Sequence, residues 1–108
     1  MTWNTPPDET FEREHGCTDA EWRGWLPGAA GPHGLRVRGA PGAPEAQEAH
    51  ITLPQGSLHL AWETLPPRRI ALITMPRMSV RYRFEGVGPE ARQAFMRYFD
   101  LYMQRGGG

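Results

Sequence analysis

Arginine and histidine alternate with apolar residues in several segments of the sequence, and together these side chains could bind an anion. Guanidinium groups hold carboxylates and phosphates through paired hydrogen bonds, and imidazole can add a donor or transfer a proton. Alternate residues of a strand lie on one face of a sheet. If the segments share one sheet, the sequence predicts a face that binds an acidic metabolite or a nucleotide, made by Arg36, Arg38, His50, His59, Arg81 and Arg83. The alternative is a solvated face whose charges only keep sheets from aggregating.

A four-residue loop over 54–57 is predicted to join the two strands that carry histidines on this face. That register pairs Ile51 with Leu60 and makes His50 and His59 diagonal neighbours, about 7–8 Å apart at the backbone. Both imidazoles are then expected on the same side of the sheet as the arginines.

Cys17 and His15 form the closest pair of residues that could act in catalysis or bind a metal. A thiol near the start of a helix can have a lowered pKa and act as a nucleophile, but no third residue that would orient His15 can be named. Zinc sites draw close pairs of ligands from two elements, and the sequence has no second pair. We therefore expect no metal and no catalytic residue, and Cys17 should pack as a small apolar side chain. A small enzyme that uses Cys17 or His59 is the weaker alternative.

The length and composition favour one domain. The chain has 108 residues, of which 39% are hydrophobic and 22% charged, and its formal net charge is zero. One domain fits this length, and strong binding of nucleic acid would need an excess of positive charge. No apolar run is long enough to cross a bilayer, and a single cysteine cannot form an internal disulfide, so we expect a cytoplasmic protein without membrane contact. All 12 basic residues are arginine, which is typical of bacterial genomes with GC-rich coding.

Acidic and basic residues are unevenly distributed along the chain. Residues 1–54 contain eight acidic residues and four arginines, whereas residues 55–108 contain four acidic residues and eight arginines. We expect the two halves to pair with each other on folding. The acidic segment 1–16 has one clear apolar anchor, Phe11, and we expect it to fray, which leaves residues 17–108 as a single domain.

Segments of period-two alternation with short connections predict an antiparallel sheet, and helices at both ends make the domain α+β. The run 70–75 is apolar on both faces and predicts a central strand. Thr18 and Glu21 form a capping box that begins a short helix ending before Pro27, and Pro89 begins a long C-terminal helix. The expected strands, about five in number, are 35–38, 50–53, 57–63, 69–75 and 78–84, and the expected helices are 19–26 and 89–105.

The C-terminal helix has an apolar stripe nearly twice as wide as a surface helix needs. Met96, Phe99 and Met103 form a flank that one small sheet would leave uncovered, unless the tryptophans of the first helix cover it. Ile70 and Leu72 of the expected central strand raise the same question. Left exposed, these five residues would form a partner interface, which a homodimer would bury symmetrically.

No motif in the sequence identifies a reaction. It contains no phosphate-binding glycine loop, nucleophile elbow, paired-cysteine motif or EF-hand loop, and we therefore expect no cofactor. The favoured hypothesis is a small non-catalytic interaction or assembly module that acts through apolar patches on the C-terminal helix or the central strand. Its partner would be a second copy of the chain or another protein. The alternative hypothesis is a domain that binds an anion on the arginine and histidine face.

Overall fold

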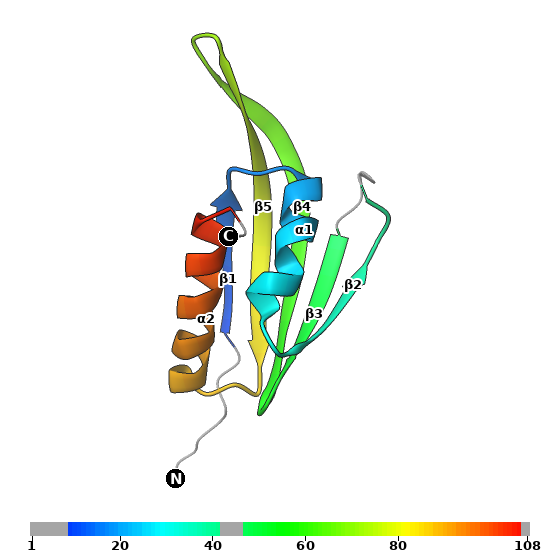
Figure 1. Cartoon of the computed structure of the whole chain (residues 1–108), viewed down its shortest axis with the longest axis vertical. Coiled ribbons are helices and arrows are strands. Elements are labelled where there is room, and N and C mark those ends of the chain that lie inside the picture. The colour runs from blue at the N-terminus through cyan, green and yellow to red at the C-terminus, as the bar shows by residue number, and fades with distance from the viewer. Residues whose placement is uncertain (1–8, 42–46, 107–108) are drawn as a thin grey trace.

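The protein is an antiparallel five-stranded sheet with two helices, which confirms the predicted α+β fold. The computed structural model describes residues 9–41 and 47–106. The strand order in the sheet is β1-β5-β4-β3-β2, so the first strand pairs with the last. Along the chain the elements are β1 (Glu9–His15), α1 (Asp19–Ala30), β2 (Gly34–Arg38), β3 (Gln47–Leu53), β4 (Gly56–Ile70), β5 (Ile73–Glu85) and α2 (Pro89–Gln104) (Figure 1).

Both helices lie on the same face of the sheet (Figure 1). α1 crosses this face on its way from the edge strand β1 to the opposite edge strand β2, and α2 runs beside it in the opposite direction. Trp22 of α1 contacts Phe99 of α2 and Trp62 of β4, with ring centroids 6.0 and 5.9 Å apart. All three rings are fully buried, and together they form the centre of the core. The opposite face of the sheet carries the polar alternate residues.

The first helix begins as predicted and ends later than predicted. The Thr18 hydroxyl accepts a hydrogen bond from the Glu21 backbone N–H at 3.1 Å, and the Glu21 carboxylate accepts one from the Thr18 N–H at 2.9 Å. α1 then continues through Pro27 to Ala30, although the sequence predicts an end at residue 26. Proline in a helix removes one backbone hydrogen bond. Complete burial of Ala29 beyond the proline offsets this cost.

The structure places residues 9–15 in strand β1, where the sequence predicts fraying; residues 1–8 lie outside the described part of the chain. Phe11 stacks on Tyr82 of β5, with ring centroids 4.7 Å apart. Several acidic side chains in the first half of the chain pair with arginines in the second half, as the uneven charge distribution predicts. These ion pairs are Glu9–Arg92, Glu12–Arg81, Glu14–Arg77 and Glu14–Arg68, with the reverse pair Arg13–Asp100. Pairing across the halves therefore holds an edge strand that has few apolar residues of its own.

The structure corrects the expected central strand 69–75. β4 continues to Ile70, the chain turns at Ala71 and Leu72, and β5 begins at Ile73. β4 and β5 pair with each other beyond the ends of β1 and β3, so their distal parts form a two-stranded arm that projects from the sheet (Figure 1). An apolar run without alternation is typical of a buried strand, but here it forms the tip of a hairpin. The fifth strand of the sheet is β1 instead.

The turn between β3 and β4 is two residues shorter than predicted. Only Pro54 and Gln55 separate the strands, so Ile51 pairs with Leu58 rather than with Leu60. A shift of two residues leaves each side chain on its predicted face. Gly56, the first residue of β4, lets the end of β5 lie close to the turn, because a Cβ at Gly56 would lie 2.1 Å from the backbone oxygen of Glu85.

Candidate functional site

The open face of the sheet brings the predicted arginines and histidines together across four strands. The registers place Arg83 opposite His59, His59 opposite His50, and His50 opposite Arg36. His50 and His59 are therefore direct rather than diagonal neighbours, and their ring centroids are 4.6 Å apart. The remaining two members of the predicted face, Arg38 and Arg81, lie at the two ends of the next row. Glu48 of β3 and Ala61 of β4 lie between them.

These side chains line a shallow depression with a volume of about 420 Å³. Part of its positive charge is already balanced. The Arg81 guanidinium pairs with Glu12 at 3.0 Å, and Glu85 accepts from Arg83 at 3.4 Å and lies 3.3 Å from His59. On the β2 side, Arg36 and Arg38 form no ion pair with a carboxylate within the part of the chain that the structure describes. Of the predicted residues, these two are the ones best placed to bind an added anion.

His50 is held in its neutral form more strongly than an isolated histidine. Partial burial lowers its pKa from the ordinary value, and the nearby His59 and Arg36 lower the pKa further, whereas Glu85 raises it. An anion bound beside Arg36 would offset this repulsion, and would therefore favour protonation of His50.

The predicted reactive pair is not arranged for catalysis. Burial and, to a smaller extent, the nearby Glu21 raise the pKa of the Cys17 thiol to about 11. His15 Nε2 lies 2.7 Å from the Tyr82 hydroxyl, and its ring packs against Trp22 at 4.9 Å. Cys17 therefore stays a protonated, buried thiol, and His15 is engaged in the core. Among residues 9–41 and 47–106, no group of three or more His, Cys, Asp and Glu side chains is close enough to hold a metal ion.

The sequence left open whether the flank of the C-terminal helix is exposed or covered by the first helix, and in the structure this flank is buried within the chain. Phe99 is fully buried, and Met96 and Met103 are 9% and 8% exposed. Trp22 covers Phe99, which is the alternative that the sequence left open. These three residues therefore do not form an exposed patch on the described chain.

The remaining two predicted interface residues lie at the tip of the arm. Leu72 is fully exposed, and Ile70 is 53% exposed. Ile73 and Met75, which the sequence analysis did not single out, are 61% and 44% exposed beside them. Alternation along the ribbon places Ile70, Ile73 and Met75 on one side, since Ile70 pairs with Ile73 and Met75 lies two residues further along β5.

Comparisons with protein-family models, with curated proteins and with solved structures found no match for this chain. In the described residues, no helix combines the length and the apolar character that crossing a bilayer requires.

Two features of these sites were not predicted from the sequence. Glu85 follows the last predicted strand and was not assigned to the polar face, yet it contacts both His59 and Arg83. Its place could be found from alternation, since it lies two residues after Arg83. The exposure of Ile73 and Met75 could not be found that way, because an apolar run has the same composition at a hairpin tip and in a buried strand.

Proposed function

We propose that this protein is a non-catalytic interaction or assembly module, and that the apolar tip of the β4–β5 arm binds a second copy of the chain. The observation that carries the proposal is the complete exposure of Leu72 at the end of a projecting hairpin. Ile70, Ile73 and Met75 extend the apolar surface around it. Contiguous exposed apolar side chains on a protein surface commonly mark an interaction site.

The turn itself supports the proposal. Ala71 has a φ of 54°, in the left-handed region where a Cβ costs about 1–2 kcal/mol. A two-residue hairpin turn with a positive φ only at its first residue favours glycine there, because glycine adopts this region without a steric cost. The chain instead carries alanine and leucine at this turn, at the expense of stability. Backbone strain combined with apolar exposure is typical of a functional position.

The test is the solution mass measured by light scattering from about 10 µM to about 1 mM, since a small apolar contact gives weak association. We expect the mass of the natural chain to rise with concentration and the mass of Leu72→Asp to stay that of one chain. Leu101→Asp is the matched control, because Leu101 is a half-exposed leucine on α2, away from the arm. It should associate as the natural chain does.

A second variant separates association from folding. Replacing Ala71 by Gly and Leu72 by Asn places glycine at the positive-φ position of the turn, so the double variant should unfold at the same temperature or higher. It should nevertheless lose association. A natural chain that remains a single copy at about 1 mM, or an equal rise in mass for Leu72→Asp, would overturn the proposal.

Anion binding on the open sheet face is the second candidate function. The observation that favours it is the unbroken row Arg36, His50, His59 and Arg83, in which Arg36, like Arg38 in the next row, has no carboxylate partner in the described chain. Pyrophosphate and citrate are suitable probes, and we expect them to raise the melting temperature more at about pH 5.5 than at about pH 7.5, because binding favours protonated His50.

The control for the anion site is another exposed arginine. Replacing Arg36 and Arg38 by Gln should abolish the rise in melting temperature, whereas Arg97→Gln on α2 should leave it unchanged. If all variants respond alike, the anions act on the whole protein and the open face is not a site.

A further inference from the structure

The two helices are unequal in length, so beside the first turns of α2 there is a part of the sheet that α1 does not cover. At about 1.5 Å per residue, α1 is about 18 Å long and α2 about 24 Å long. The C-terminal end of α1 lies level with Tyr98, whose hydroxyl donates a hydrogen bond to the Gly28 carbonyl at 2.9 Å. A Cβ at Gly31, the residue after the helix, would lie 3.4 Å from the Tyr98 ring. The first turns of α2, before Tyr98, therefore extend past the end of α1.

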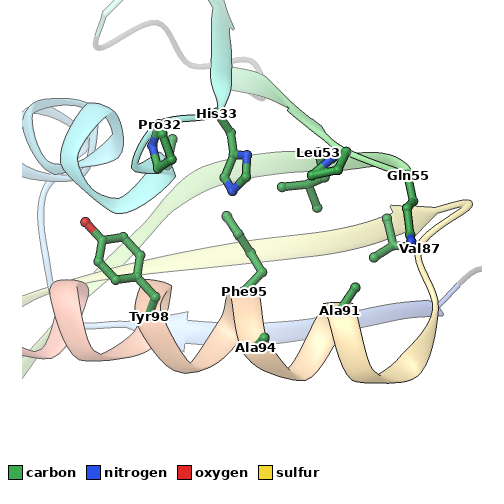
Figure 2. A pocket seen from close by; sticks show the side chains of 11 residues that line it. Pro32, His33, Leu53, Gln55, Val87, Ala91, Ala94, Phe95 and Tyr98 are labelled. Atoms are coloured by element: carbon green, nitrogen blue, oxygen red, sulfur yellow. The ribbon is translucent and has the colours of Figure 1, made fainter.

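A pocket of about 470 Å³ occupies this uncovered region. Figure 2 shows side chains pointing into it from the α1–β2 connection, the β3–β4 turn, the start of α2 and the chain just before α2. Leu53, Val87 and Phe95 are buried and form its apolar base. His33 forms one wall, and its ring centroid is 5.7 Å from that of Phe95. Pockets of this volume are of the size that holds small molecules.

The lining contains no charged side chain among the described residues, apart from the titratable His33. Its other polar side chains are the Gln55 amide and the Tyr98 hydroxyl, and the hydroxyl already donates to Gly28. An ionised ligand would lose its hydration without gaining an ion pair, which is costly. The pocket therefore fits an uncharged molecule. This chemistry is the opposite of that on the open sheet face.

We propose that this pocket binds a small, uncharged, largely apolar or aromatic molecule, one polar group of which hydrogen-bonds to His33 or Gln55. Phe95 offers an aromatic face to a planar ligand. The inference does not depend on the arm, because none of the residues that line the pocket belongs to the arm.

The test uses two fluorescent probes that share an aromatic skeleton and differ in charge. N-phenyl-1-naphthylamine is uncharged, and 8-anilino-1-naphthalenesulfonate adds a sulfonate. We expect the uncharged probe to bind at one site per chain, and at least tenfold more tightly than the sulfonate. No saturable binding of the uncharged probe, or equal or tighter binding of the sulfonate, would overturn the proposal.

Substitution at the pocket entrance locates the site. Ala91 points into the pocket from α2 (Figure 2), so Ala91→Phe should fill part of it and weaken binding of the uncharged probe at least tenfold. Ala20→Phe adds the same ring at an exposed position of α1 outside the pocket, and should bind the probe as the natural chain does. Equal binding by the two variants would place the probe elsewhere and overturn the assignment.

Chemical shifts give a readout that does not depend on any variant folding. Amide signals of the labelled natural chain should move most at Leu53, Val87 and Ala91 when the uncharged probe is added. If the largest changes fall instead on Arg36 and His50, the probe binds the open sheet face and the proposal fails.

The tip of the arm from a second copy is the other apolar group that could fill the pocket. Leu72→Asp separates this occupant from a small molecule. If a neighbouring tip fills the pocket, this variant should bind the probe more tightly than the natural chain at high protein concentration, which would overturn the small-molecule proposal. We expect unchanged probe binding. The same variant reports on arm-mediated association through its mass, so the two proposals can fail separately.

Discussion

At the scale of single residues, His15 is a half-buried titratable group that contacts the core. Burial lowers its pKa from the ordinary value, Arg13 lowers it further, and Asp100 raises it. The imidazole lies between the Trp22 ring and the Tyr82 hydroxyl, so a proton added to it would be a charge largely removed from water.

Because the folded-state pKa of His15 is below its unfolded value, the unfolded chain binds more protons as the pH falls. The free energy of unfolding should therefore be largest above the ordinary histidine pKa of 6.5 and decrease as the pH falls below it. Denaturant unfolding from about pH 7.5 to about pH 5 measures this, and one such group contributes a slope of at most about 1.4 kcal/mol per pH unit. His15→Gln should flatten the profile, and an unchanged slope would contradict the assignment.

His50→Gln is the comparison at the surface, because the pKa of His50 is also lowered. Its effect should be smaller than that of His15→Gln, since His50 lies on the open face of the sheet, whereas His15 packs against the Trp22 ring and contacts the Tyr82 hydroxyl. A larger effect at His50 would mean that repulsion within the arginine and histidine row outweighs burial in the core.

The polar face could be predicted from the sequence because alternation alone decides which side of a strand a residue occupies. Arg36, Arg38, Arg81 and Arg83 are on one face for this reason. The direct contact between the two histidines could not be predicted, since it depends on the length of the turn between β3 and β4. At the end of this turn, Gly56 lies against the end of β5, which is a contact between segments distant in sequence that alternation does not reveal.

At the scale of elements, local sequence signals predicted the starts of the helices better than their ends. The capping box of α1 and the proline at the start of α2 fixed both helix starts. The end of α1 and the place of the 69–75 segment depended on packing with the rest of the chain. Pro27 remains inside a helix because the residues after it are buried, and the apolar run is exposed because it extends beyond its neighbouring strands.

Two glycines in different elements should respond in opposite directions to alanine. A Cβ at Gly24 of α1 meets no atom within 4 Å, so Gly24→Ala should raise the free energy of unfolding by about 1 kcal/mol. A Cβ at Gly56 would lie 2.1 Å from a backbone oxygen, so Gly56→Ala should lower it by about 1–3 kcal/mol. Denaturant unfolding of both variants checks this, and a neutral Gly56→Ala would contradict the close approach of the end of β5 to Gly56.

At the scale of the whole molecule, the arm makes the chain elongated. The principal extents are 57 × 27 × 25 Å, and the radius of gyration of the Cα atoms is 15.0 Å. A compact chain of this length would have a radius of gyration of about 13 Å. The arm therefore accounts for a shape that apolar composition alone does not predict.

Small-angle X-ray scattering at low concentration tests whether the arm stays extended in solution. The Leu72→Asp variant is the suitable sample, because the proposed association is removed. We expect a radius of gyration of about 15 Å or more, clearly above the value of about 13 Å for a compact chain. A value near the compact limit would mean that the arm folds back onto the sheet, and that its tip is not available to a partner.

The pairing of β1 with β5 also determines when the sheet can be completed during synthesis of the chain. Glu9 pairs with Phe84, so the first strand leaves the ribosome long before the strand that receives it. The hairpins that join β3 to β4 and β4 to β5 involve neighbouring segments and can form earlier, whereas pairing of distant segments is slow. Closure of the sheet is therefore a late event. Until β1 pairs with β5, the edge of β5 remains open, and newly made chains are most vulnerable to aggregation in that interval.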